Sequence, residues 1–462
     1  MRKAAGARLL PIFLSLAFAA TAAETALDRY VKTPDPAYKY ELVKTVPGDG
    51  YTTYVIELTS QTWRKPEEVD RTVWKHWLIV VKPDKIQGTT GYLFITGGSV
   101  NDKMPDKIDD PTFVDNALTT HTVVAELQDV PNEPLVFKDE TRRRSEDAII
   151  AYAQVKYLAT ADPSWILRLP MTKSAVRAMD TITSFLATPA AGNVKVEKFV
   201  VSGGSKRGWT TWTTAAVDKR VVAIIPMSID MLNLEKSFEH HYRVYGFWAP
   251  AVKDYVEAGL MDWNGTPEYE KMLDIEEPYR YRDRLTLPKF IVNAAGDQFF
   301  LPDSSRFYFD DLKGEKYLRY LPNTNHHREG TDYRESNIAF YEAILHGTPR
   351  PHFTWKFESN GDIRVVSKDK PSAVKLWQAT DPDHRDFRLM TIGPAYKSSE
   401  LEDQGGGVYV AHVDPPAKGW TAFLVEMTYP SGGKYPFKFT TGVRITPDTE
   451  PFPPYQPKRP VK

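Results

Sequence analysis

Residues 199–210 read FVVSGGSKRGWT: a short apolar run leads into a glycine turn, then a serine and a helix-prone segment. Such a sharp strand-to-helix turn, called a nucleophile elbow, holds a serine hydroxyl out above a sheet. Gly203 lies two positions before Ser205, where a Cβ would collide with the neighbouring turn. The usual second glycine is replaced by Arg207, and Gly208 follows it. The spacing G-x-S-x-x-G predicts Ser205 as a catalytic nucleophile.

Strand-like and helix-like segments alternate on both sides of this elbow. Runs of β-branched and aromatic residues are typical of strands, and apolar residues spaced three and four apart are typical of helices. Their alternation predicts an α/β fold with a mainly parallel, doubly wound sheet. We expect strands at residues 51–58, 74–81, 92–96, 122–125, 199–201, 221–225, 289–292 and 317–320, and helices at 146–158, 173–186, 205–217 and 337–345.

Two regions depart from this α/β pattern, which spans residues 24–348. Residues 230–287 are aromatic, charged and helix-prone, and they are too many for an ordinary connection between strands. We interpret them as a helical insertion that caps the sheet. Residues 349–462 contain short alternating runs separated by turn residues, and they end in a proline-rich tail. This spacing predicts a C-terminal β-sandwich of immunoglobulin-like type.

A serine on an elbow needs an orienting acid and a histidine base, which follow it in the chain in that order. The strand at 289–292 is followed by Gly-Asp, which places the carboxylate of Asp297 at the end of a strand. The strand at 317–320 is followed by a polar turn and His326. Because parallel strands end at one edge of a sheet, we expect Ser205, Asp297 and His326 to meet there.

The sequence leaves alternatives open for both partners. His327 adjoins His326, and adjacent side chains cannot both point into one site. Asp230, just past the strand that follows the elbow, and Asp303 are alternative acids. The Gly-Asp turn favours Asp297.

Acyl transfer also needs hydrogen-bond donors for the developing oxyanion. One donor is expected to be the backbone N–H of Lys206, the residue after the nucleophile. The turn after the strand at 92–96 contains Gly98 and Ser99, whose amides are candidates for the second donor. A plain glycine loop is the alternative interpretation of this turn.

Polar residues past another early strand are candidates for binding the substrate. Glu126, Gln128 and Glu133 lie there, and their side chains would suit a substrate amine, which would favour an aminopeptidase. Ordinary polar loop residues are the alternative interpretation.

The first 23 residues predict export. Arg2, Lys3 and Arg8 precede a short apolar run, and small residues follow it, so residues 1–23 read as a signal peptide removed near Ala22-Ala23. The run is too short to span a bilayer, which needs about 20 apolar residues. We therefore expect a periplasmic or secreted protein without stable membrane insertion.

The composition excludes several classes of function. The 462 residues include no cysteine, which removes thiol nucleophiles and zinc–thiolate sites. Net charge is −1, and without the leader 56 basic face 60 acidic side chains, so nucleic acid is not an expected partner. We expect no metal and no cofactor. The sequence does not indicate an oligomeric state.

Five stretches give the chain a family resemblance. They are GGSKRGWTTW at 203–212, PNEPL at 131–135, RSEDA at 144–148, LPMTKSAVRAMD at 169–180 and PNTNH at 322–326. Through them the sequence resembles the PhoPQ-activated pathogenicity-related proteins of bacteria, a family related to the amoebal autocrine proliferation repressor. The resemblance covers nearly the whole mature chain.

The resemblance implies a secreted protein of the α/β-hydrolase superfamily with a serine triad, carried onto Ser205, Asp297 and His326. It makes a hydrolase of small esters or peptides the leading expectation, and a peptidase linked to virulence or antimicrobial-peptide resistance one form of it. Two alternatives stay open. One is a non-catalytic secreted binding or signalling protein on the same scaffold, and the other is a polysaccharide esterase.

Overall fold

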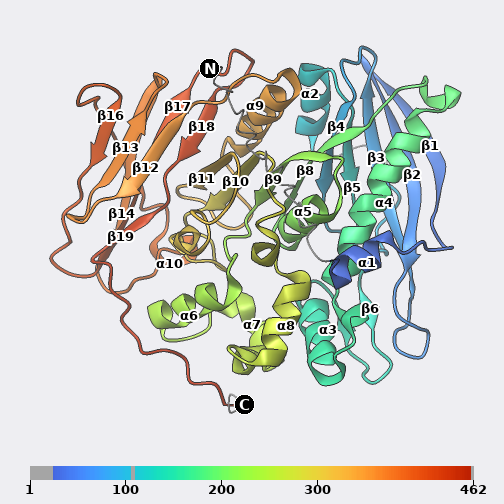
Figure 1. Ribbon diagram of the computed structural model, residues 1–462, viewed down its shortest axis with the longest axis horizontal. Coiled ribbons are helices and arrows are strands. Elements are labelled where there is room, and N and C mark those ends of the chain that lie inside the picture. Colours follow the sequence, from blue (N-terminus) through green and yellow to red (C-terminus); the bar gives the residue numbers. More distant parts are fainter. Residues whose placement is uncertain (1–23, 106–109, 459–462) are drawn as a thin grey trace, which may run out of the picture.

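A mixed sheet forms the centre of the protein in the computed structural model, which describes residues 24–105 and 110–458 (Figure 1). The predicted signal peptide, residues 1–23, lies outside the described residues. The strands of the α/β part of this sheet are β1 (Lys39–Gly48), β2 (Tyr51–Thr62), β3 (Val73–Pro83), β4 (Thr90–Ile95), β5 (Val124–Leu127), β8 (Lys198–Gly204), β9 (Val221–Met227), β10 (Lys289–Ala294) and β11 (Lys316–Leu321).

These strands lie in the order β1-β2-β3-β5-β4-β8-β9-β10-β11. The antiparallel strands β1, β2 and β3 lead into a parallel run from β5 to β11. The elbow strand β8 is thus in the middle of the parallel region. This order confirms the predicted mainly parallel α/β sheet.

Helices cover both faces of the sheet, and the side chains of β8 show why. Phe199 and Val201 point into one apolar cluster, while Val200 between them points into another. Both faces are therefore buried, which is typical of parallel strands with near-continuous apolar sequences. The helices of the α/β part are α1 (Ala26–Lys32), α2 (Pro111–Thr120), α3 (Asp147–Thr160), α4 (Arg168–Leu186), α5 (Lys206–Val217) and α9 (Tyr333–His346).

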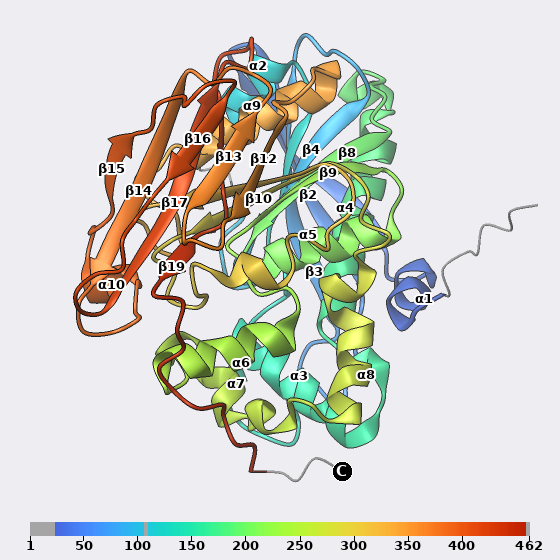
Figure 2. The same ribbon diagram turned by 60° about the vertical axis from the view of Figure 1, so that its left-hand side comes forward.

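The insertion at 230–287 is helical. It forms α6 (Leu234–Tyr245), α7 (Lys253–Glu257) and α8 (Pro267–Glu276) between β9 and β10. Figure 2 shows these helices grouped with α3 beyond one end of the sheet. A short hairpin of β6 (Leu135–Val136) and β7 (Arg143–Arg144) precedes α3.

The C-terminal strands form two sheets that share an apolar core, and one of these sheets is continuous with the central one. The joining pair is β11 and β18, which are antiparallel. Pairing with β18 covers an edge of the parallel sheet whose backbone groups would otherwise lie open. One sheet has the order β12 (Phe353–Phe357), β13 (Ile363–Ser367), β16 (Val408–Ala411); the other has β18 (Phe437–Thr440), β17 (Trp420–Tyr429), β14 (Ala373–Asp381), β15 (Lys397–Glu400), with β19 (Arg444–Thr446) on β17 and α10 (Leu389–Ile392) between β14 and β15.

The sequence predicted this sandwich without the shared sheet. Its immunoglobulin-like type stays a prediction. The difference arises because an edge-to-edge strand pairing between distant segments leaves no mark on the local alternation of either segment.

The proline-rich tail packs against the insertion. Its Tyr455 ring lies 5.0 Å from the Tyr242 ring and 5.2 Å from the Trp248 ring, and the Phe452 N–H donates to the carbonyl of Arg243 at 2.9 Å. The red segment after β19 can be followed along α6 in Figures 1 and 2. The described part of the tail therefore packs against the helical insertion.

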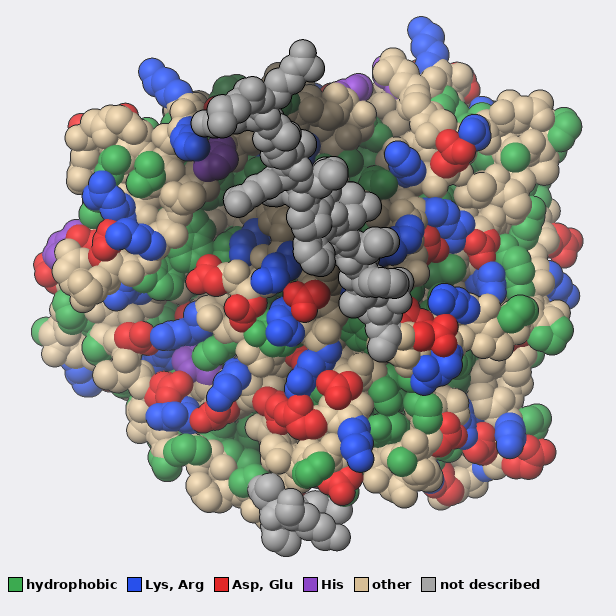
Figure 3. Space-filling view, viewed as in Figure 1, with side chains coloured by type: hydrophobic (Ala, Val, Ile, Leu, Met, Phe, Trp, Pro, Cys, Tyr) green, Lys and Arg blue, Asp and Glu red, His purple; other side chains and the backbone are tan. Residues whose placement is uncertain are grey.

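Charged side chains of both signs are interspersed over the face drawn in Figure 3. Such mixing fits the near-neutral composition. Across residues 24–105 and 110–458, the helices lack the combined length and apolarity that crossing a bilayer requires.

Candidate active site

Ser205 occupies the turn between β8 and α5, with φ 57° and ψ −128°. Few residues other than glycine adopt this conformation, and strained backbones of this kind gather at functional sites. The Ser205 N–H donates to the carbonyl of Met227 at 2.8 Å, which fastens the turn to the end of β9. The predicted elbow is present.

The shifted glycine of the motif has a steric explanation. A Cβ at Gly203 would lie 2.7 Å from the carbonyl oxygen of Arg207, and one at Gly208 would lie 2.8 Å from that of Met227. Gly208 therefore lets α5 begin close to β9. Arg207 occupies the usual glycine position because its side chain leaves the crowded turn and reaches Glu146.

His326 and Asp297 are hydrogen-bonded to each other. The His326 Nδ1 and Asp297 Oδ2 atoms are 2.7 Å apart, in the loops after β11 and β10. Both side chains are buried, with 6% and 3% of their surface exposed. The other Asp297 oxygen accepts from the Phe299 N–H at 2.7 Å. The carboxylate thus holds Nδ1 of the ring and leaves Nε2 to face other groups.

Ser205 and His326 line one cavity of about 410 Å³ at the ends of the parallel strands. The spacing argument thus placed the elbow and the base in one site. The Phe299 ring packs against the His326 ring in a tilted contact, with centroids 4.5 Å apart, and covers one side of the base.

The alternative base and acids have other surroundings. His327 is exposed and lies at the rim of the cavity. Asp230 is buried and accepts hydrogen bonds from Tyr308 and Tyr320, each at 2.6 Å. Burial raises the pKa of Asp230 to about 8. Asp303 is held by other partners, His240 and Arg385. The geometry favours Asp297 and His326.

The predicted oxyanion loop is only partly at the cavity. Lys206, whose N–H opens α5, lines the cavity, as do Thr96 and Gly97. The Ser99 N–H instead donates to the Asp102 carboxylate at 2.8 Å. Gly98 lies directly against the Asp129 side chain: a Cβ on Gly98 would be 2.3 Å from a carboxylate oxygen of Asp129. The structure therefore moves the second candidate donor from Gly98 and Ser99 to Gly97.

The three residues predicted to bind a substrate amine do not line this cavity. Glu126 lines a separate cavity with Phe94 and Phe113. The side-chain amide of Gln128 donates to the Glu126 carboxylate at 3.1 Å.

Glu133 is buried and accepts the backbone N–H of Glu146 at 2.5 Å. Burial and the charge of Glu146 raise the pKa of Glu133 to about 8. The amine site at these residues stays a prediction, and the structure places all three outside the lining of the Ser205 cavity.

A charged cluster that the sequence did not reveal lies beside Ser205. The carboxylate of Glu146 accepts from Arg207 at 2.8 and 2.9 Å and forms an ion pair with Lys206 at 2.7 Å. Burial alone would raise the pKa of Glu146, but the charges of Arg207 and Lys206 outweigh burial and lower this pKa to about 2. Glu146 adopts φ 56° and ψ −128°, the same strained backbone as Ser205. The only sequence signal was the arginine in place of a glycine.

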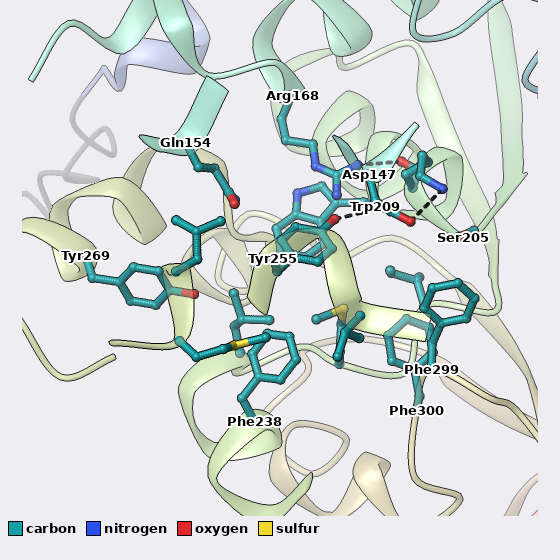
Figure 4. A pocket seen from close by; sticks show the side chains of 17 residues that line it. Asp147, Gln154, Arg168, Ser205, Trp209, Phe238, Tyr255, Tyr269, Phe299 and Phe300 are labelled. Atoms are coloured by element: carbon teal, nitrogen blue, oxygen red, sulfur yellow. Dashed lines mark hydrogen bonds and ion pairs between the residues drawn. The ribbon is translucent and has the colours of Figure 1, made fainter. Parts of the chain in front are cut away.

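Ser205 also lines a second, apolar pocket (Figure 4). Its volume is about 40 Å³. Phe238 of α6, Tyr255 of α7 and Tyr269 of α8 line it, so the insertion forms its walls. Polar groups lie at its edge, where the Tyr255 hydroxyl donates to Asp147 at 2.9 Å.

Comparison with known protein sequences identifies a matching family and a relative. A family model described as PhoPQ-activated pathogenicity-related protein matches residues 27–388. Autocrine proliferation repressor protein A of Dictyostelium discoideum is 36% identical over 472 residues, which covers 96% of this chain and 94% of that protein.

Solved structures show weaker similarity. An acetyl xylan esterase from Paenibacillus sp. R4 has a TM-score of 0.47 and 16% identity, over 69% of this chain and 90% of its own. A glucuronoyl esterase from Solibacter usitatus has a TM-score of 0.40 and 14% identity, over 69% and 91%. The sheet order and the elbow described above have the features of an α/β-hydrolase fold. On the evidence of the family model and the 36% identical relative, the chain belongs to the PhoPQ-activated pathogenicity-related protein family.

Proposed function

We propose that this protein is a serine hydrolase that cleaves esters with a small acyl group, using Ser205, His326 and Asp297. The observation that carries the proposal is the buried hydrogen bond between Asp297 and His326 in a cavity that Ser205 also lines. The strained elbow supports it, since such strain persists only where the surrounding structure enforces it.

Each residue has a distinct role in this mechanism. The Ser205 hydroxyl attacks the carbonyl carbon and passes its proton to Nε2 of His326, which then gives it to the leaving group. Asp297 keeps the other ring nitrogen protonated and stabilises the imidazolium. The backbone N–H of Lys206, with that of Gly97, stabilises the oxyanion. Water then hydrolyses the acyl-enzyme in the reverse sequence.

We assign the acyl group and the leaving group of the substrate to different pockets. The apolar pocket of about 40 Å³ suits a short acyl chain, and the charged cavity of about 410 Å³ suits a polar leaving group. Glu126 and Glu133, which would have bound the amine of a peptide, are engaged elsewhere. We therefore favour an ester over an N-terminally free peptide.

The test is covalent labelling of the folded protein by a fluorophosphonate, which reacts with activated serines. We expect wild type to take up one label and the Ser205→Ala and His326→Ala variants to take up none. His327→Ala is the matched control and should label like wild type. A folded wild-type protein that takes up no label would refute the proposal.

A binding or signalling function is the second candidate. The relative from Dictyostelium discoideum is named as a repressor of proliferation, and that name describes a biological effect rather than a reaction. If this candidate were correct, the Ser205→Ala protein would keep the full biological effect of wild type. Loss of the effect in this variant would exclude it.

We also propose that the protein acts outside the cytoplasm after removal of residues 1–23. The support is the charged, apolar and small-residue order of that segment. N-terminal sequencing of protein recovered from outside the cytoplasm should begin near Ala23. A chain that retains Met1 and stays in the cytoplasm would contradict this proposal.

A further inference from the structure

Arg328 lies two residues after the proposed base, in the wall of the same cavity. One terminal nitrogen of its guanidinium donates to the carbonyl oxygen of His326 at 2.8 Å and to the Ser228 hydroxyl. The other terminal nitrogen lies 3.1 Å from the point where a Cβ on Gly204 would stand. The guanidinium is therefore adjacent to the residue that precedes Ser205.

Within the described residues, this buried arginine forms no direct ion pair. The Tyr333 ring centroid lies 5.0 Å from its guanidinium carbon, and the charge of Asp297 acts on it from farther away. Only 8% of its surface is exposed, and its Nε is buried with no hydrogen-bond partner. Throughout the described part of the chain, no Asp or Glu oxygen forms an ion pair with Arg328. Buried cations are normally paired, because burying an isolated charge is expensive. Burial accordingly lowers the pKa of Arg328.

Two other buried arginines show the usual arrangement, whereas Arg168 at the apolar pocket is buried with an unpartnered Nε like that of Arg328. Arg207 binds both oxygens of Glu146 at 2.8 and 2.9 Å in the same cavity. Arg385 binds Asp303 at 2.8 Å. Arg328 differs from both in facing the site without a carboxylate.

The cavity as a whole is cationic. Its charged lining consists of Lys206, Arg207 and Arg328 against the single carboxylate of Glu146, apart from the histidines. Glu146 is already held by Lys206 and Arg207. An anion that entered the cavity would therefore meet Arg328 as the lining cation that has no directly paired carboxylate.

We propose that Arg328 binds a carboxylate on the leaving group of the substrate, so that the ester carries an acid a few bonds from the cleaved carbonyl. The inference rests on the hydrolase function proposed above and names its substrate class. The position of the guanidinium beside Gly204 sets the distance, since a group bound there is next to Ser205. Binding would give the guanidinium a carboxylate in direct contact.

A purely structural role is the competing explanation. Arg328 holds the His326 carbonyl, and its backbone has φ 63°, so it also shapes the histidine loop. This role would affect charged and neutral substrates equally. The recognition role would affect only the charged ones, and a comparison of the two separates the explanations.

The experiment uses 3-acetoxybenzoate and its neutral counterpart 3-acetoxybenzamide. We expect wild type to favour the carboxylate in kcat/KM. Arg328→Gln should lower kcat/KM for the carboxylate by about 10- to 100-fold, mainly through KM, as for loss of a hydrogen bond to a charged group. It should change the value for the amide less than about threefold. Arg334→Gln, which removes a nearby arginine paired with Asp110, is the control and should leave both unchanged.

Calorimetric titration makes the test independent of turnover. The Ser205→Ala protein should bind 3-hydroxybenzoate more tightly than 3-hydroxybenzamide, and the added Arg328→Gln change should remove the difference. Equal binding of the two compounds, or an equal loss of kcat/KM on both esters in Arg328→Gln, would overturn the proposal. If fluorophosphonate labels Ser205 but carboxylates do not bind, this inference fails and the hydrolase stands. If labelling fails while carboxylates bind through Arg328, the hydrolase fails instead.

Discussion

Gly208 should be intolerant of even one added carbon. In Gly208→Ala the new Cβ would stand 2.8 Å from the Met227 carbonyl oxygen and 3.0 Å from the Ile229 side chain. Overpacking of this kind costs about 1–3 kcal/mol, while alanine regains up to about 1 kcal/mol of helix propensity over glycine. We expect a net loss of roughly 1 kcal/mol in the free energy of unfolding, measured by urea denaturation.

The same change should also disturb the nucleophile. The Met227 carbonyl that the new Cβ would press on is the one that accepts the Ser205 N–H at 2.8 Å. Displacement of Ser205 by a few tenths of an ångström should slow fluorophosphonate labelling by about tenfold, since a 1 Å error can cost 10²-fold. Adding Ile229→Val should not restore the rate, because the nearest atom belongs to the backbone. A Gly208→Ala protein as stable and as reactive as wild type would refute this reasoning.

Three further changes test other parts of the site. Asp297→Asn should lower kcat by about 10⁴-fold at unchanged circular dichroism, because the amide would hold the wrong tautomer of the histidine; a loss below tenfold would exclude Asp297 as the orienting acid. The folded protein keeps Asp230 protonated up to its raised pKa of about 8, whereas the unfolded chain loses that proton at about pH 4, so wild type loses stability between these pH values. Asp230→Asn lacks this titration and should therefore gain stability relative to wild type across that range, by up to about 1.4 kcal/mol per pH unit. Parallel curves of thermal stability against pH for the two proteins would contradict this. Phe238→Ala should enlarge the apolar pocket and shift the preference among 4-nitrophenyl esters from acetate toward hexanoate by about tenfold in kcat/KM; an unchanged chain-length profile would show that the acyl group lies elsewhere.

The sequence was informative where chemistry follows from local order. Ser205 is recognisable because a strand, a glycine turn and a helix must be contiguous to form an elbow. Asp297 and His326 could be proposed because each follows a parallel strand, and such strands end at one edge of a sheet. Neither inference required knowledge of the packing.

Other predicted positions depend on the conformation of loops, which the sequence pattern does not specify. Gly98 and Ser99 lie in the predicted loop, but Ser99 is turned toward Asp102, and Thr96 and Gly97 line the cavity instead. Glu133 is close to the site in space but is bound to the backbone of Glu146. A loop conformation depends on contacts with distant segments, and the residue types alone do not specify it.

By itself, the sequence determined the α/β class and the elbow and predicted the three residues proposed as a triad, because periodicity and spacing along one segment express local backbone geometry. Only the tertiary structure placed His326 rather than His327 against Asp297, joined β18 to the central sheet, and brought Glu146 to Arg207. It also left Arg328 buried with no ion pair to a described carboxylate. These outcomes depend on side-chain direction and on contacts between segments far apart in the chain, and both are set when the core packs.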